Sequence, residues 1–183
     1  MSDLEKLTNL VLAPYIMKAT ALIGVRRKIG GNQFRHAFAT LGILLDYKLF
    51  SDHVLLKASV IHDLIEDVPS TDITGLRSID QEAWKVVDLV IEVTHRPDEE
   101  KPVFLKRILD SGSSNAKILK TADRISNLTD LHLGFFSNLE MDNYLDETEQ
   151  FILPMASDVN PDMVIELVDL INIRRSLILK NSR

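Results

Sequence analysis

The chain has 183 residues, the usual size of one domain, with 45% hydrophobic and 26% charged residues, so we expect a single globular domain over residues 1–183. It contains no cysteine, which excludes disulfides, thiolate nucleophiles and cysteine-based zinc sites. A formal net charge of −6 disfavours sequence-independent binding of nucleic acid, because that binding depends on neutralising phosphates with Lys and Arg.

The amino terminus lacks the basic start and the apolar run of a secretory signal, and no later stretch is apolar for long enough to span a bilayer. We therefore expect a cytoplasmic protein with no membrane partner. Nothing in the sequence fixes its oligomeric state.

The first half of the chain predicts helices separated by one basic loop. Apolar residues recur at helical spacing nearly everywhere, and no run of alternating β-branched residues indicates a sheet, so we expect an all-α protein. The expected order is two short helices divided at Pro14, a basic loop over 26–33, a helix from about Phe34, and a helix capped by Ser51 and Asp52 that continues through Ile65 and ends before Pro69.

The second half continues the helical pattern. The expected order is a helix after Asp80 with Trp84 in the core, a loop over 97–102, a short helix over 104–109, a helix after Ser113 and Ser114 that runs to about Leu131, and two C-terminal helices, the last opened by Asn160 and Pro161 and ending near Lys180.

Polar residues gather near the end of the helix that follows Asp52. His62, Asp63, Glu66 and Asp67 occupy positions i, i+1, i+4 and i+5, so a period of 3.6 residues brings them to one side. Such a pattern is usually only the solvated acidic face of an amphipathic helix. Here the same sector one or two turns earlier is largely apolar and looks buried, and buried carboxylates need a metal or a cation.

Two further segments could supply ligands. Lys120, Asp123 and Asn127 form one stripe of a helix, so Asp123 could point inward, although an exposed Lys120–Asp123 ion pair is the more ordinary interpretation. His36 lies on an apolar helix, where a single histidine is usually a hydrogen-bonded core residue. The residues alone leave these alternatives open.

Taken in order, these segments resemble a known family. The order Arg27…His36, then His62-Asp63-x-x-Glu66-Asp67, then Lys120-x-Ala122-Asp123-Arg124-x-x-Asn127-Leu128, resembles the HD-type hydrolase domain of RelA/SpoT homologues, above all the small alarmone hydrolases, over roughly residues 5–155. The resemblance implies a helical HD phosphohydrolase that removes the 3′-pyrophosphate from (p)ppGpp-like nucleotides of the stringent response. The products would be GDP or GTP and pyrophosphate.

The resemblance also implies a metal site. His36, His62, Asp63 and Asp123 match the family's metal ligands. Two imidazoles and two carboxylates leave room for water and suit Mn²⁺, with iron, cobalt or zinc as further possibilities. A divalent ion of this kind lowers the pKa of bound water and neutralises phosphate charge during attack.

Six more positions match functional residues of the family. Glu66 and Asp67 match its catalytic pair, which orients or deprotonates water and gives a proton to the departing ribose oxygen; the spacing does not decide which residue does which. Arg27 and Lys28 match basic positions around the base and phosphates, and Asn127 and Tyr144 match nucleotide-contacting positions.

The chain departs from the family in one loop. It has Ile29-Gly30-Gly31-Asn32-Gln33 where many relatives have Ser-Gly-Glu-Pro-Tyr, which leaves the preference for guanine or adenine open. One alternative is therefore an HD phosphohydrolase for another nucleotide, such as (p)ppApp, a nucleoside 5′-phosphate or NADPH. The other is an inactive nucleotide-binding module. The remaining histidines, His53, His95 and His132, are not assigned to the metal.

Overall fold

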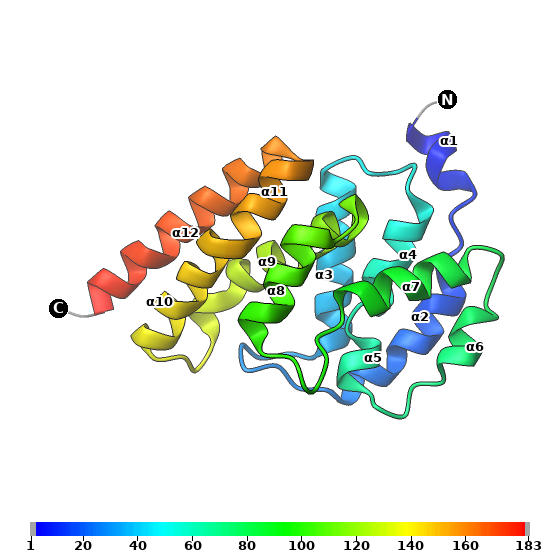
Figure 1. Cartoon of the computed structure of the whole chain (residues 1–183), viewed down its shortest axis with the longest axis horizontal. Coiled ribbons are helices and arrows are strands. Elements are labelled where there is room, and N and C mark those ends of the chain that lie inside the picture. The colour runs from blue at the N-terminus through cyan, green and yellow to red at the C-terminus, as the bar shows by residue number, and fades with distance from the viewer. Residues whose placement is uncertain (1–2, 182–183) are drawn as a thin grey trace. The chain divides into compact units, whose positions relative to one another are not determined.

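The computed structural model describes residues 3–181, which form helices joined by loops (Figure 1). Within those residues no strand forms, and the isolated β-bridge pairs Arg26 with Asn32. The all-α prediction is confirmed. The elements are α1 (Asp3–Thr8), α2 (Ala13–Ala19), the 3₁₀ helix η1 (Thr20–Gly24), α3 (Gln33–Asp46), α4 (His53–Ile61), α5 (Leu64–Asp67), α6 (Ile73–Arg77), α7 (Ala83–Val93), α8 (Lys101–Ser111), α9 (Ser114–Asp130), the 3₁₀ helix η2 (Leu131–Leu133), α10 (Asn138–Glu147), the π-helical η3 (Thr148–Ile152), α11 (Leu153–Val159) and α12 (Pro161–Asn181).

The described residues form two compact units. The first unit contains the chain up to Arg26 together with Asn32–Arg96, and the second contains Arg27–Gly31 together with the chain from Pro97 onward. The expectation of one domain over residues 1–183 stays a prediction. No described helix has both the length and the apolar character needed to cross a bilayer.

In the first unit, α4 lies at the centre. It packs against α2, α3 and α7, and every residue from Leu55 to Ile61 is buried, as expected of a helix that is largely apolar all round. Asp52 caps α4 by accepting a hydrogen bond from the backbone N–H of Leu55 at 2.9 Å, as predicted. Asn32 caps α3 in the same way, with the N–H of Arg35 as donor at 3.0 Å.

The helix expected to continue through Ile65 is interrupted at His62 and Asp63. α4 ends at Ile61 and α5 begins at Leu64, although both intervening residues keep right-handed helical dihedral angles. The prediction of a continuous helix is therefore wrong at this point. The His62 ring lies 2.8 Å from the carbonyl oxygen of Ser59 and competes with the backbone for that acceptor.

In the second unit, α9 packs against α11 and α12. Ser113 caps its start, accepting from the N–H of Ala116 at 3.1 Å. At its other end, the buried guanidinium of Arg174 donates to the carbonyl oxygens of Leu128 and Thr129 at 2.8 and 2.5 Å. Helix α9 is thus fixed at both ends, which holds the side chains along it in place.

Trp84 corrects one expectation about the core. Its side chain is 58% exposed, and the guanidinium of Arg77 lies 4.1 Å from the centre of its ring. The prediction that Trp84 belongs to the core is wrong because α7 buries its valines at positions 86, 87, 90 and 93, which leaves the Trp84 side of the helix toward solvent.

Candidate active site

His36 and His62 come together in the first unit, from α3 and from the turn after α4. Both are buried, with exposed fractions of 2% and 4%, and their ring centres lie 5.3 Å apart. His36 is therefore not an isolated core histidine. A second imidazole faces it.

The hydrogen bond of His62 to Ser59 determines its tautomer. A carbonyl oxygen can only accept, so Nδ1 of His62 carries a proton, and in the neutral ring Nε2 presents a lone pair. Metal-ligating histidines are commonly oriented by this kind of bond on the other ring nitrogen. Ser59 is a contributor that the sequence analysis did not name, and its position one turn before His62 was the available signal.

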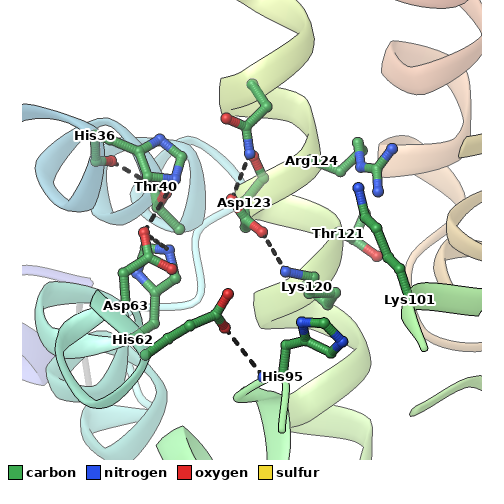
Figure 2. A network of polar contacts seen from close by, with 12 residues as sticks. His36, Thr40, His62, Asp63, His95, Lys101, Lys120, Thr121, Asp123 and Arg124 are labelled. Atoms are coloured by element: carbon green, nitrogen blue, oxygen red, sulfur yellow. Dashed lines mark hydrogen bonds and ion pairs between the residues drawn. The ribbon is translucent and has the colours of Figure 1, made fainter. Parts of the chain in front are cut away.

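Asp63 completes a three-residue cluster. Its Oδ2 atom lies 3.2 Å from Nε2 of His62 and 3.7 Å from Nε2 of His36, and Figure 2 shows the carboxylate pointing toward both rings. Two imidazole nitrogens and one carboxylate oxygen are a donor set that fits a divalent transition metal. This cluster can therefore contribute ligands to such an ion.

Glu66 and Asp67 follow in α5 and are held in different ways. Glu66 is exposed, and its Oε2 accepts from the backbone N–H of His95 at 3.0 Å. Asp67 is half-buried, and its Oδ2 accepts from the side-chain amide of Gln33 at 2.8 Å. Burial raises the pKa of Asp67, and the nearby charge of Asp63 adds to this, while the hydrogen bond from Gln33 opposes it. The sequence analysis had not named Gln33 as a site residue.

Asp123 lies on α9 in the second unit and is 6% exposed. Its Oδ2 accepts from Nζ of Lys120 at 2.7 Å, and its Oδ1 accepts from Nδ2 of Asn127 at 2.6 Å. The expected Lys120–Asp123 pair is thus present, but it is largely buried rather than solvated. A buried carboxylate with two donors in fixed positions is well oriented to bind a cation.

Asn127 also joins Asp123 to Arg27. Its Oδ1 accepts from the guanidinium of Arg27 at 2.5 Å, so the amide is engaged at both ends. Two residues predicted to bind the nucleotide therefore contact each other, together with one predicted metal ligand. Lys28 is exposed, and its Nζ lies 5.7 Å from the ring centre of Phe136.

Tyr144 is half-buried under two cations of the second unit. The guanidinium of Arg124 lies 3.9 Å from the ring centre, and Nζ of Lys101 lies 5.2 Å from it. Arg124 and Lys101 both pair with Glu147, at 2.6 and 3.2 Å. Burial raises the pKa of Tyr144, although the charge of Arg124 acts in the opposite direction. The face of the Tyr144 ring is thus covered by cations that Glu147 holds in place.

Comparison with known proteins gives matches among solved structures. No protein-family model matches the chain, and no curated protein does either. Among solved structures, the chain is similar to a metazoan ortholog of SpoT that hydrolyses ppGpp and plays a role in starvation responses. The two share 22% sequence identity with a TM-score of 0.78, over 89% of this chain and 94% of the other. The likeness is one of fold: this chain has the same helical architecture as that protein.

Proposed function

We propose that this chain is a divalent-metal-dependent hydrolase that removes the 3′-pyrophosphate from (p)ppGpp-like nucleotides. The observation that carries the proposal is the pair of buried histidines His36 and His62 with the carboxylate of Asp63 beside them, and with Glu66 and Asp67 one turn beyond. Its support is the likeness in fold to the metazoan ortholog of SpoT, which hydrolyses ppGpp.

The metal would be held by His36, His62, Asp63 and Asp123, four residues that offer nitrogen and carboxylate ligand atoms. We assign Mn²⁺ as the ion, because mixed imidazole and carboxylate ligands suit it. Two features support these ligands: the proton on Nδ1 of His62, which leaves Nε2 available, and the orientation of Asp123 by Lys120 and Asn127. When bound, the ion would acidify water and offset the negative charge of the phosphates.

Glu66 and Asp67 would act as the general base and general acid of the reaction. Water attacks the phosphorus atom bonded to the 3′ oxygen, the bond between that oxygen and phosphorus breaks, and pyrophosphate leaves. One carboxylate accepts a proton of the attacking water, and the other, in its protonated form, gives its proton to the departing ribose oxygen. Both carboxylates are held by a hydrogen bond, from His95 and from Gln33, which limits their motion.

The nucleotide would be bound by Arg27, Lys28, Asn127 and Tyr144. Arg27 is suited to stack on the base or to bind a phosphate, and its bond to Asn127 holds the guanidinium in place. Tyr144 would lie near the ribose or base, beside the cations of Arg124 and Lys101. A cytoplasmic location and the lack of a nucleic-acid partner stay predictions.

Product analysis tests the proposal. The chain is incubated with ppGpp, pppGpp, ppApp, a nucleoside 5′-phosphate or NADPH in Mn²⁺, and products are separated by anion exchange. We expect GDP or GTP with an equal amount of pyrophosphate, no reaction after chelation, and no reaction in His62→Ala. His132→Ala, which changes an exposed histidine, should behave like the unaltered protein.

Other outcomes distinguish the alternatives. Turnover of ppApp, a nucleoside 5′-phosphate or NADPH in preference to the guanosine nucleotides would reassign the substrate while keeping the metal chemistry. Tight nucleotide binding without any turnover would indicate an inactive binding module and contradict the proposal.

A further inference from the structure

Two side chains of α3, Gln33 and His36, each lie against an acidic side chain that follows α4. His36 Nε2 lies 3.7 Å from Asp63 Oδ2, and Gln33 Nε2 lies 2.8 Å from Asp67 Oδ2. Residues three or four positions apart share one face of a helix, so the segment with Gln33 and His36 faces the segment with Asp63 and Asp67. The second contact therefore repeats the first, one turn further along.

Gln33 is the first residue of α3, and a hydrogen bond holds its backbone in place. Its backbone N–H donates to the carbonyl oxygen of Val25 at 3.0 Å, and the bridge between Arg26 and Asn32 closes the loop at its base. Asn32 caps the helix at the preceding position. The start of α3 is thus tied to the segment of Val25 and Arg26, which fixes the backbone from which the Gln33 side chain extends.

The side-chain amide of Gln33 is oriented by Asp67. Its Nε2 donates to the carboxylate, while its Oε1 is buried and has no hydrogen-bond partner among residues 3–181. Rotating the amide by half a turn would place Oε1 against the carboxylate, and two acceptors repel each other. The contact with Asp67 is therefore the interaction that selects this orientation.

Asp67 depends on Gln33 in return. Asp67 accepts a side-chain hydrogen bond from Gln33 at Oδ2, and within the described chain its Oδ1 accepts none. Glu66 differs, because its carboxylate is held by a backbone N–H that no side-chain substitution removes. The hydrogen bond to Oδ2 of Asp67 comes from a side chain, so a single substitution at Gln33 can remove it.

We propose that Gln33 is a positioning residue, which holds Oδ2 of Asp67 so that Oδ1 faces the reacting groups. The role rests on the proposed function, because it assumes that Asp67 takes part in hydrolysis. Gln33 itself need not touch the substrate. A displaced catalytic group of this kind typically costs about 10²-fold in rate, even when the displacement is only about 1 Å.

The contact can be tested without any activity measurement. In an NMR spectrum of the side-chain amides, the Gln33 signals are identified by their loss in Gln33→Met. We expect these signals to shift clearly in Asp67→Asn, which removes the carboxylate acceptor, and much less in Glu66→Gln. Unchanged Gln33 signals in Asp67→Asn would overturn the inference.

Kinetics test the positioning role. We expect Gln33→Met to lower kcat by about 10- to 100-fold, with KM changed by less than about threefold and with full metal content. Gln150→Met makes the same chemical change at an exposed glutamine and should have no effect. In the Asp67→Asn background, measured with enzyme in excess, Gln33→Met should cause no further loss, because its effect passes through Asp67.

The outcomes separate this inference from the proposed function. A normal kcat in Gln33→Met overturns the positioning role. So does a fall in kcat that Gln33→Met causes equally in the unaltered protein and in the Asp67→Asn background. In both cases hydrolysis by the unaltered protein still stands. An unaltered protein that hydrolyses none of the nucleotides overturns the proposed function, and the positioning role with it. Should Gln33→Met fail to fold, Gln33→Glu keeps the shape, removes the donor and is expected to lower kcat at least as much.

Discussion

The Nδ1 atom of His62 lies 2.8 Å from the carbonyl oxygen of Ser59, one turn earlier in the chain. Because the carbonyl accepts, the proton is on Nδ1, and Nε2 is left to face Asp63 Oδ2 at 3.2 Å. A backbone group thus sets the chemical state of a proposed metal ligand. The same hydrogen bond accompanies the interruption between α4 and α5, which places Glu66 and Asp67 in a separate short helix.

Asp123→Asn should lose metal and activity together, with turnover lower by at least about 10²-fold. A neutral amide is a poorer ligand, and its NH₂ group would be set against the donors of Lys120 or Asn127. Elemental analysis and turnover are measured side by side. Asp110→Asn changes an exposed carboxylate paired with Lys106 and should keep both. Full metal content with normal turnover would remove Asp123 from the site.

Glu66→Gln and Asp67→Asn should each keep the metal and bind substrate but lose roughly 10²- to 10⁴-fold in turnover, since an amide cannot accept the proton. Metal content, nucleotide affinity and kcat are the measurements. Asp169→Asn, an exposed change on α12, should leave all three unaltered. If both site variants turned over at normal rates, the pair would be only an acidic surface, and the acid–base mechanism would be wrong.

Arg27→Ala should raise KM roughly 10-fold and change kcat much less, because a charged contact to the nucleotide is made in the ground state and the transition state alike. Asn127→Ala should reproduce part of the rise, since Asn127 holds the guanidinium of Arg27. Steady-state kinetics decide this, with the exposed neighbour Arg26→Ala as a control of equal charge change. A large fall in kcat at unchanged KM would instead assign Arg27 to the charge of the transition state.

A polar network in the first unit should make stability depend on pH. Lys57 is 4% exposed and donates to Asp80 at 2.9 Å and Glu82 at 2.6 Å, while the hydroxyl of Tyr15 donates to Asp80 at 3.1 Å. Burial alone would raise the pKa of Asp80, but the hydrogen bonds from Lys57, Tyr15 and the backbone outweigh it and lower that pKa. Burial, with the charge of Asp80, raises the pKa of Tyr15.

The direction in which stability changes with pH follows from the difference in pKa between the folded and unfolded states. A lowered pKa in the folded state gives stability that is present above the unfolded value, about 3.9 for Asp, and lost as the pH falls further. A raised pKa of Tyr15 gives stability that is lost as the pH rises beyond about 10. Asp80→Asn should therefore lower the free energy of unfolding by about 1–3 kcal/mol at neutral pH and flatten its acid dependence. Urea unfolding across the acid range checks this, and an unchanged slope would count against the network.

Local patterns in the sequence determined most of the helices. The cap at Asp52 lies where the sequence predicted it, because a cap depends on one side chain and a backbone N–H two or three residues away. Helical periodicity is local in the same sense, so the all-α class followed from spacing alone. The proposed metal ligands required more than spacing: the order of the segments and their resemblance to a family named His36, His62, Asp63 and Asp123.

Tertiary packing decided what spacing could not. Gln33 meets Asp67 and Arg27 meets Asn127 across 34 and 100 residues of sequence, so no local pattern encodes either contact. The exposure of Trp84 also depends on which face of α7 is covered by other helices. The sequence by itself thus determined the helices and the chemical types available to a site. Packing decided which of these side chains meet and how each is oriented, because contacts between distant residues depend on the arrangement of the whole helices that carry them.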